Sequence, residues 1–356
     1  MTTLLIVTDA WYPQTNGVVH SLDAVGKHLQ GQGYTVQYLT PERFWTVPMP
    51  TYPEIRLSLA PIGAVADIIA RIAPDHIHIA TEGPLGLQAK FFCLEQGLAY
   101  TTSYHTRFPQ YVSARVPVPT EWSYAYLRWF HSGSAATLVP TPSILGELAE
   151  HGFENLRIWS RGVDTDRFHP GPKTAFLDLP GPHLLYVGRV AVEKNVEAFL
   201  RLKVPGSRIV VGDGPQLPEL KQAFPEAVFV GKKHGEELAA LYRSADVLVF
   251  PSRTDTFGNV MIEAMASGVP VAAYPVAGPL DVLTDPAAGA MDENLDVAVV
   301  RALALSRDAA RRRQPLYLDS GRRAVPFGAG TGDRLARPGR LIRAGGVPHP
   351  PAASSP

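Results

Sequence analysis

Short apolar runs alternate with amphipathic helical segments along most of the chain. The runs that predict strands in the first half are Leu4–Thr8, Thr35–Leu39, Ile55–Leu59, Ile77–Ala80, Tyr100–Tyr104 and Ala136–Val139. Between most of them lie segments such as 18–30, where apolar side chains recur at helical spacing until Gly31 and Gly33 end the helix. Strands separated by helices indicate parallel β-α-β units.

Residues 161–182 interrupt this alternation with the composition of a linker, because several prolines and glycines follow Phe168. A second series of predicted strands comes after it, at Leu184–Val187, Ile209–Val211, Val228–Val230, Val247–Phe250 and Val269–Ala273. Helices are predicted between these strands, near 193–202, 215–224, 235–244 and 258–267. We therefore predict an α/β protein in which two Rossmann-like domains, 1–160 and 183–313, face a cleft and bind ligands at the carboxyl ends of their strands.

The alternation of apolar runs and helical segments stops near the end of the chain. A helical pattern persists over 296–313, but residues 314–356 contain 7 Pro, 7 Gly and 6 Arg, with no Lys or Glu. Prolines and glycines at this density interrupt a helix. We expect 314–356 to be a disordered tail that supplies no helix to hold the two domains together.

The composition excludes several classes of protein. Lys and Arg together number 33, as do Asp and Glu, so the net charge of zero argues against nucleic-acid binding by the chain as a whole. The single cysteine, Cys93, excludes a disulfide framework. Residues 1–17 lack the features of a signal peptide, and no apolar run is long enough to span a membrane. We expect a cytoplasmic protein, with peripheral attachment to the inner face of the membrane as an open alternative.

The segment from Ser252 to Pro270 carries the most specific chemical pattern. Asp255 lies just before Gly258, where a helix is predicted to begin, and Glu263 follows in the second turn of that helix. A carboxylate within an otherwise apolar helix needs a polar partner, because burying it unpaired is costly. A sugar diol would satisfy Glu263 by donating two hydroxyl hydrogen bonds. The alternative is a structural Glu paired with a Lys or Arg.

This segment resembles the signature of the retaining nucleotide-sugar glycosyltransferases of family 4, in which two acidic residues flank seven others. The first acid is commonly Glu in that family, so Asp255 departs from the pattern by one methylene. The resemblance extends over roughly residues 1–312 and includes three further segments of the second domain. These are Val187–Arg189 with Glu193–Asn195, Gly212–Pro215, and Phe229–Lys232. It implies the GT-B fold.

The resemblance also implies the roles of individual residues. The donor-binding positions are Arg189, Lys194, Gly231, Lys232, Gly258, Asn259 and Glu263, and the catalytic positions are Gly17, His105 and Asp255. Arg189 and Lys194 would neutralise the donor diphosphate at a helix N-terminus, which agrees with their charges; ordinary surface charges are the alternative. The resemblance assigns Glu263 to the ribose diol and Asp255 to the hexose hydroxyls. It implies no metal and no other cofactor.

Two positions in the first domain belong to this pattern. Gly17 ends a turn-rich loop after the first strand, where it lets backbone N–H groups approach a phosphate. His105 follows the strand Tyr100–Tyr104, and the resemblance implies that it reaches the donor sugar. The alternatives are an ordinary turn and a structural histidine.

Two other patterns suggest metal ligands. Asp164 and Asp166 form an Asp-x-Asp motif that holds Mn or Mg in a different glycosyltransferase fold, but here they lie in the predicted linker. His76 and His78 sit two residues apart on an apolar strand, and no third zinc ligand is evident. We interpret both pairs as structural.

Aromatic residues cluster over 104–130. With Thr120 as N-cap, a predicted helix would place Trp122, Tyr126, Trp129 and Phe130 on one face. Interspersed arginines favour a lipid-acceptor and membrane-interface surface, and packing in the core of the first domain is the alternative. This region most resembles the family branch that contains GDP-mannose-dependent α-mannosyltransferases and sulfoquinovosyl-diacylglycerol synthase.

The sequence therefore predicts a retaining hexosyltransferase that uses a nucleotide diphosphate sugar, GDP-mannose or a UDP-hexose, and a lipid or glycolipid acceptor. Two alternatives remain open. One is a UDP-sugar epimerase of the same shape, which would need further carboxylates. The other is a sugar-nucleotide-binding protein with impaired catalysis. The expected partners are the donor, the acceptor and a membrane surface, and nucleic acid is not expected.

Overall fold

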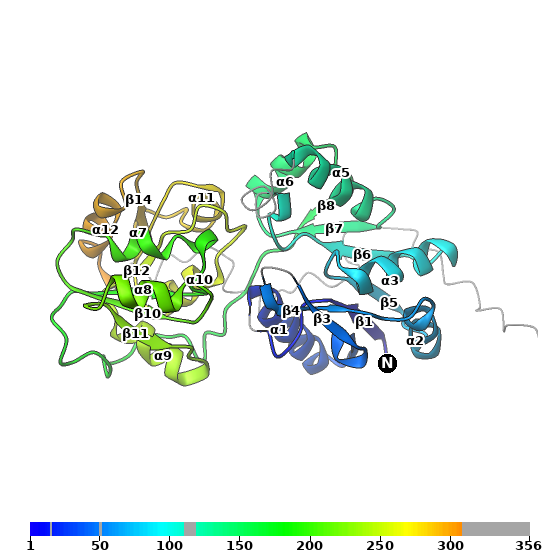
Figure 1. Ribbon diagram of the computed structural model, residues 1–356, viewed down its shortest axis with the longest axis horizontal. Coiled ribbons are helices and arrows are strands. Elements are labelled where there is room, and N and C mark those ends of the chain that lie inside the picture. The colour runs from blue at the N-terminus through cyan, green and yellow to red at the C-terminus, as the bar shows by residue number, and fades with distance from the viewer. Residues whose placement is uncertain (15, 50–51, 110–118, 308–356) are drawn as a thin grey trace, which may run out of the picture. The chain divides into compact units, whose positions relative to one another are not determined.

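The computed structural model describes residues 1–14, 16–49, 52–109 and 119–307. The predicted tail over 314–356 lies outside them. The described residues form two six-stranded sheets, one in each half of the chain, and one two-stranded hairpin. Helices cover both six-stranded sheets, as Figure 1 shows. The predicted α/β class with two parallel sheets is confirmed.

The first sheet is parallel throughout and has the strand order β2-β1-β5-β6-β7-β8. Its strands are β1 (Thr3–Val7), β2 (Thr35–Leu39), β5 (His76–Ile79), β6 (Tyr100–Ser103), β7 (Ala136–Val139) and β8 (Leu156–Ile158). The described helices of this half are α1 (Gly17–Gly31), the 3-10 turn η1 (Pro41–Arg43), α2 (Ala64–Ile72), α3 (Pro84–Glu95), α5 (Thr120–His131) and α6 (Pro142–Glu150). The order reverses between β1 and β5, so a ligand is expected beyond their carboxyl ends.

One predicted strand does not join this sheet. The run Ile55–Leu59 belongs to β4 (Tyr52–Ser58), which pairs antiparallel with β3 (Thr46–Met49) in a separate hairpin. The prediction of a parallel β-α-β unit was therefore wrong here. Among the described residues, β2 and β4 are separated by the short turn η1 and by β3, with no helix between them, and a parallel connection needs a longer crossover.

The second sheet has the strand order β11-β10-β9-β12-β13-β14 and is also parallel. Its strands are β9 (His183–Val187), β10 (Ser207–Val211), β11 (Val228–Gly231), β12 (Val247–Phe250), β13 (Val271–Ala273) and β14 (Gly289–Met291). Its helices are η2 (Val192–Lys194), α7 (Val196–Leu200), α8 (Leu217–Ala223), α9 (Gly235–Ser244), α10 (Asn259–Ala266), α11 (Ala277–Val282) and α12 (Leu295–Leu303). This is the strand order of dinucleotide-binding folds, which bind ligands where the order reverses, here between β9 and β12.

One histidine of the pair on β5, His78, has a structural role. His78 is fully buried, and its two ring nitrogens each lie 2.9 Å from a hydroxyl oxygen, of Thr101 and Ser103 on β6. Burial lowers the pKa of His78 to about 3. The side chain therefore joins two strands as a neutral ring.

This burial predicts a pH effect on stability. The unfolded chain protonates His78 near pH 6.5 but the folded chain does so only near pH 3, so stability from this residue is lost as pH falls through that window. In urea unfolding, the stability advantage of the wild type over His78→Gln should shrink by about 2 kcal/mol between about pH 7.5 and about pH 5. Burial raises the pKa of Asp9 to about 6. Asp9 titrates in both proteins, so its contribution cancels in the difference between their stabilities. An advantage that does not change with pH would contradict the burial argument.

Candidate functional site

Two glycine-containing loops interlock at the carboxyl end of the second sheet. Gly188 N donates to Val211 O (3.0 Å), and Val190 N donates to Asp213 O (2.9 Å). Gly212 has a φ of +148°, and a Cβ placed on it would lie 1.8 Å from Gly188 O. Only glycine permits this approach, which fixes the loop after β9 against the loop after β10.

Arg189 and Lys194 lie on the loop after β9. Arg189 is half-buried beyond the end of the strand, and burial lowers the pKa of its guanidinium. Lys194 ends the 3-10 turn η2, and its Nζ donates to Asp255 Oδ1 in a partly buried ion pair. The structure therefore joins a predicted diphosphate residue to a predicted hexose residue.

Hydrogen bonds from side chains to backbone oxygens also join the loops after β9 and β12, at what we call the junction. Ser252 Oγ and Thr254 Oγ1 both donate to Glu193 O, at 3.4 and 3.3 Å. Asn195 Nδ2 donates to Pro251 O (3.2 Å). Because β9 and β12 flank the point where the strand order reverses, this junction lies where a parallel α/β sheet binds its ligand.

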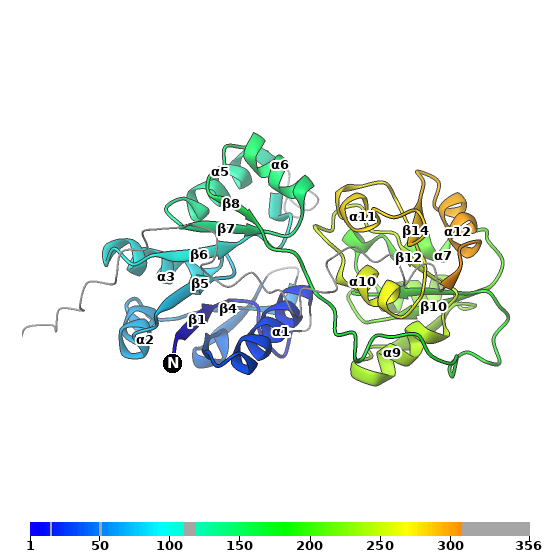
Figure 2. The ribbon, with the colours of Figure 1, turned by 180° about the vertical axis from the view of Figure 1, so that it is seen from behind.

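Glu263 lies in the second turn of α10, as predicted, and its partner is a tyrosine. Tyr242 Oη on α9 donates to Glu263 Oε2 over 2.8 Å. The helices α9 and α10 lie side by side in both views (Figures 1 and 2). Burial raises the pKa of Glu263, and the tyrosine hydrogen bond opposes that shift. The contact satisfies one carboxylate oxygen with a neutral donor, and the positive charge of Arg167 also opposes the shift in pKa.

Gly258 and Asn259 form the start of α10. Gly258 has a left-handed φ of +89°, and a Cβ there would lie 2.8 Å from both Met261 Cε and Phe250 Cζ. Asn259 Nδ2 lies 3.8 Å from the position of a Cβ on Gly17, and it donates to Ser21 Oγ over 3.4 Å. The structure thus brings together Gly17, on the first turn of α1, and Asn259.

His105 follows β6 and is buried. Its backbone oxygen accepts a hydrogen bond from Thr256 Oγ1 (2.9 Å), one residue beyond Asp255. Its Nδ1 lies 2.7 Å from Nη2 of Arg161. Burial, and next the positive charge of Arg161, lowers the pKa of His105 well below its usual range.

Gly231 and Lys232 are placed at the end of β11. Gly231 has a φ of +76°, and its carbonyl oxygen accepts from Gly212 N (2.9 Å), which connects it to the interlocked loops. Lys232 is exposed; burial is the main cause that lowers the pKa of His20, and the Lys232 charge adds to it. Within the described ranges, neither makes a hydrogen bond or ion pair to another predicted donor-binding residue.

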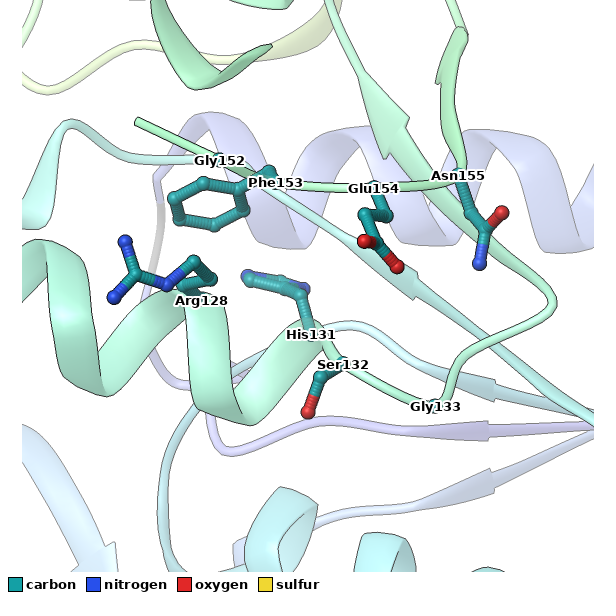
Figure 3. Close-up of a pocket in the computed structure, with 8 residues that line it drawn as sticks. All are labelled: Arg128, His131, Ser132, Gly133, Gly152, Phe153, Glu154 and Asn155. Atoms are coloured by element: carbon teal, nitrogen blue, oxygen red, sulfur yellow. The ribbon is translucent and has the colours of Figure 1, made fainter. Parts of the chain in front are cut away.

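A cavity of about 350 Å³ lies elsewhere, in the first half. Figure 3 shows its lining, which is contributed by the end of α5 and the segment before β8. The lining residues are Arg128, His131, Ser132, Gly133, Gly152, Phe153, Glu154 and Asn155. No predicted site residue lines it, so the candidate site is not this cavity.

The aromatic residues of α5 (Thr120–His131) lie in different environments, so neither a membrane-interface surface nor core packing describes all of them. Thr120 is the first residue of α5 and Pro119 occupies the N-cap, so the prediction of Thr120 as N-cap was wrong. Trp122 and Trp129 are 70% and 45% exposed, whereas Phe130 is 0% exposed in the core. The four aromatics therefore do not share one environment: the tryptophans face solvent and Phe130 packs inside. Tyr111 and Arg115 lie outside the described residues.

Tyr242, Thr256 and Arg161 were not predicted from the sequence. No local pattern marks them, because each becomes relevant only through a contact with a residue far away in the chain.

Asp164, of the Asp-x-Asp motif, accepts a hydrogen bond from Arg167 N (3.1 Å) and lies within 4 Å of the Arg167 guanidinium. These contacts form a structural turn. In the part of the chain that the structure describes, no three His, Cys, Asp or Glu side chains gather as a metal site. No described helix is long and apolar enough to cross a membrane.

Two sequence-family models match the chain. The model described as Glycosyl transferases group 1 matches residues 181–305, and the model described as Glycosyltransferase Family 4 matches residues 15–167. The fold agrees with them. Sucrose-phosphate synthase from Thermosynechococcus elongatus superposes with a TM-score of 0.71 at 22% identity, covering 87% of this chain and 92% of its own. The architecture is that of the GT-B glycosyltransferases.

Similar proteins narrow the class of glycosyltransferase. A GDP-mannose-dependent alpha-mannosyltransferase of Corynebacterium glutamicum is 31% identical over 317 residues, which cover 82% of this chain and 76% of the relative. Sulfoquinovosyl transferase SQD2 of Arabidopsis thaliana is 34% identical over 67% of this chain and 50% of its own length. Alpha-monoglucosyldiacylglycerol synthase of Streptococcus pneumoniae is 23% identical over 85% of this chain and 78% of the relative. The chain belongs to the family 4 glycosyltransferases and is an enzyme of that class.

Proposed function

We propose that this enzyme transfers a hexose from a nucleotide diphosphate sugar, GDP-mannose or a UDP-hexose, to a lipid or glycolipid acceptor, with retention of configuration. The observation that carries the proposal is the junction at the reversal point of the second sheet. There the ion pair of Lys194 and Asp255 joins the loops after β9 and β12, and Arg189 lies on the first of these loops. The names of the relatives support the donor and acceptor classes.

The junction suits a reaction whose main demand is charge stabilisation. When the bond between the anomeric carbon and the phosphate oxygen breaks, negative charge develops on the departing diphosphate. Arg189 and Lys194 supply cations at that place, and the ion pair with Asp255 holds the Lys194 ammonium in position beforehand. In the proposed reaction the acceptor hydroxyl attacks the face that the diphosphate leaves and passes its proton to a phosphate oxygen.

The donor class is tested by thermal shift with GDP-, UDP- and ADP-sugars. A ligand that binds only the folded protein raises its melting temperature according to its concentration and affinity. We expect a rise with GDP-mannose or a UDP-hexose and none with ADP-glucose. The rise should vanish in Glu263→Ala. A flat response to all three donors in the wild type would contradict the proposal.

The proposed reaction needs no divalent metal, because Arg189 and Lys194 carry the neutralising charge. Transfer rates measured with and without a chelator should therefore agree within about twofold. A matched assay adds Mg or Mn to the chelated enzyme and should find no further gain. Loss of transfer in chelator, restored by either metal, would contradict this part of the proposal.

The acceptor class predicts binding to anionic lipid vesicles through α5. Trp122 and Trp129 are exposed beside exposed Arg128, and the Trp129 ring lies 5.9 Å from that of Phe91 on α3. Tryptophan favours the membrane interface, and cations favour anionic lipid. Replacing both tryptophans with alanine should reduce vesicle binding about tenfold or more in sedimentation.

A matched variant separates this surface from exposed tryptophan in general. Trp45 is 88% exposed but lies outside α3 and α5, so Trp45→Ala should bind vesicles like the wild type. Equal binding by all three proteins, or loss of folding in the double variant, would favour a structural role for the α5 aromatics.

A further inference from the structure

Arg161 is a buried cation that none of the residue patterns explains. It lies just beyond β8, at the start of the segment that leads to the second half, and is 8% exposed. Among the described residues it makes no ion pair with a carboxylate, and its Nε and Nη1 are buried without hydrogen-bond partners. Its Nη2 lies 2.7 Å from His105 Nδ1, at hydrogen-bond distance. A buried guanidinium is costly, so a contact of this kind calls for a reason.

The contact fixes which ring nitrogen of His105 carries the proton. A guanidinium has five donor N–H groups and no acceptor, so it must donate in this hydrogen bond. His105 Nδ1 therefore accepts and holds no proton. A neutral imidazole then carries its proton on Nε2, and this buried Nε2 has no hydrogen-bond partner among the described residues.

We propose that Arg161 is a positioning residue that locks His105 as the neutral Nε2–H form, so that His105 serves the transfer as a hydrogen-bond donor and not as a base. With Nδ1 occupied by Arg161 and Nε2 protonated, the ring has no free lone pair to take a proton. Its single free group is an N–H, which fits a hydroxyl oxygen of the transferred hexose. This inference rests on the proposed function for the identity of that acceptor, but the locked form itself does not.

The surroundings favour the neutral ring. Burial is the main cause that disfavours a positive charge on His105, and the Arg161 cation adds to it; the other titratable groups that act on this ring are His78 and His131. The Trp159 ring lies 6.0 Å from the His105 ring and within 5.6 Å of the Arg161 guanidinium carbon, which adds a cation–π contact. Thr256 Oγ1 holds the His105 backbone oxygen, so both ends of the residue are fixed.

The experiment is nitrogen NMR of the full chain with ¹⁵N-labelled histidine, with the His105 signals assigned by their loss in His105→Gln. In the wild type we expect an unprotonated Nδ1 and a protonated Nε2 from about pH 8 down to about pH 5.5. Arg161→Met keeps much of the side-chain bulk but no donor, and should mix the two neutral forms. Arg161→Lys restores a donor and a charge, and should restore the Nε2–H form.

Transfer kinetics give the second readout. Arg161→Met should lower kcat by about tenfold to a hundredfold and shift the acid limb of the pH profile upward, with partial recovery in Arg161→Lys. A wild type protonated on Nδ1, or an Arg161→Met variant with an unchanged ring form and normal kcat, would overturn the inference. If Arg161→Met does not fold, the wild-type spectrum and Arg161→Lys still decide. The expected ring form in an enzyme that transfers no sugar would overturn the proposed function alone.

Discussion

Replacing Glu263 with alanine is expected to raise the dissociation constant of the sugar nucleotide by roughly 30-fold to 1,000-fold. The proposed role of Glu263 is to accept hydrogen bonds from the ribose diol, and two charge-assisted bonds are worth about 2–4 kcal/mol together. The carboxylate is partly buried beside α9, where Tyr242 Oη donates to it over 2.8 Å. Isothermal titration of donor into the two proteins measures the change directly.

Tyr242→Phe is the matched control for that measurement. It removes the hydroxyl that donates to Glu263 but leaves the carboxylate in place, so donor affinity should fall by less than about tenfold. Both variants need a melting curve, because Glu263→Ala also leaves the buried Tyr242 hydroxyl without its acceptor. Near-normal donor affinity in a folded Glu263→Ala protein would remove the ribose role.

Removing the Lys194 ammonium should lower kcat by roughly 100-fold to 1,000-fold, the usual effect of deleting one group that stabilises charge developing in a transition state. Lys194→Ala takes away a cation proposed to neutralise the diphosphate. It also leaves Asp255 without its ion-pair partner, in a place where a second negative charge opposes the leaving group. Steady-state kinetics at saturating donor isolate this effect from donor binding.

A charge-matched control lies nearby on the chain. Arg201 follows α7, is exposed, and pairs with Glu197 on the same helix. Arg201→Ala removes one positive charge from the same half of the enzyme but none from the junction, so its kcat should stay within about twofold of the wild type. Equal kinetics for the wild type, Lys194→Ala and Arg201→Ala would show that Lys194 does not act on the leaving group.

Much of the fold follows from periodicity in the sequence. The strands β2, β7 and β12 begin and end where the predicted runs do. The run of β12 is apolar throughout because this strand is buried along its whole length, whereas β2 and β7 are buried only in part. Two edge strands, β8 and β14, were not predicted, since each has only three residues and β8 is largely exposed. The β3–β4 hairpin was misassigned because a single strand pattern does not specify the direction of its partner.

The candidate site was predicted in part. The motif around Asp255 and Glu263 predicts the start of α10, because Gly258 stands directly before the first residue of that helix. The residues that contact these site residues cannot be predicted from a local sequence pattern. His105 and Arg161 are 56 positions apart, and Tyr242 and Glu263 are 21 positions apart on different helices. Only tertiary packing brings such pairs together.

The central claim is most directly tested by following the sugar. The full chain is incubated with a donor labelled in its hexose and with vesicles that contain a diacylglycerol-type acceptor, and label in the lipid phase is compared with nucleotide diphosphate released. Our account predicts equal amounts of the two with GDP-mannose or a UDP-hexose, and an α-linked product from an α-linked donor. Donor that binds yet yields no labelled lipid, or label that leaves as free sugar, would contradict it.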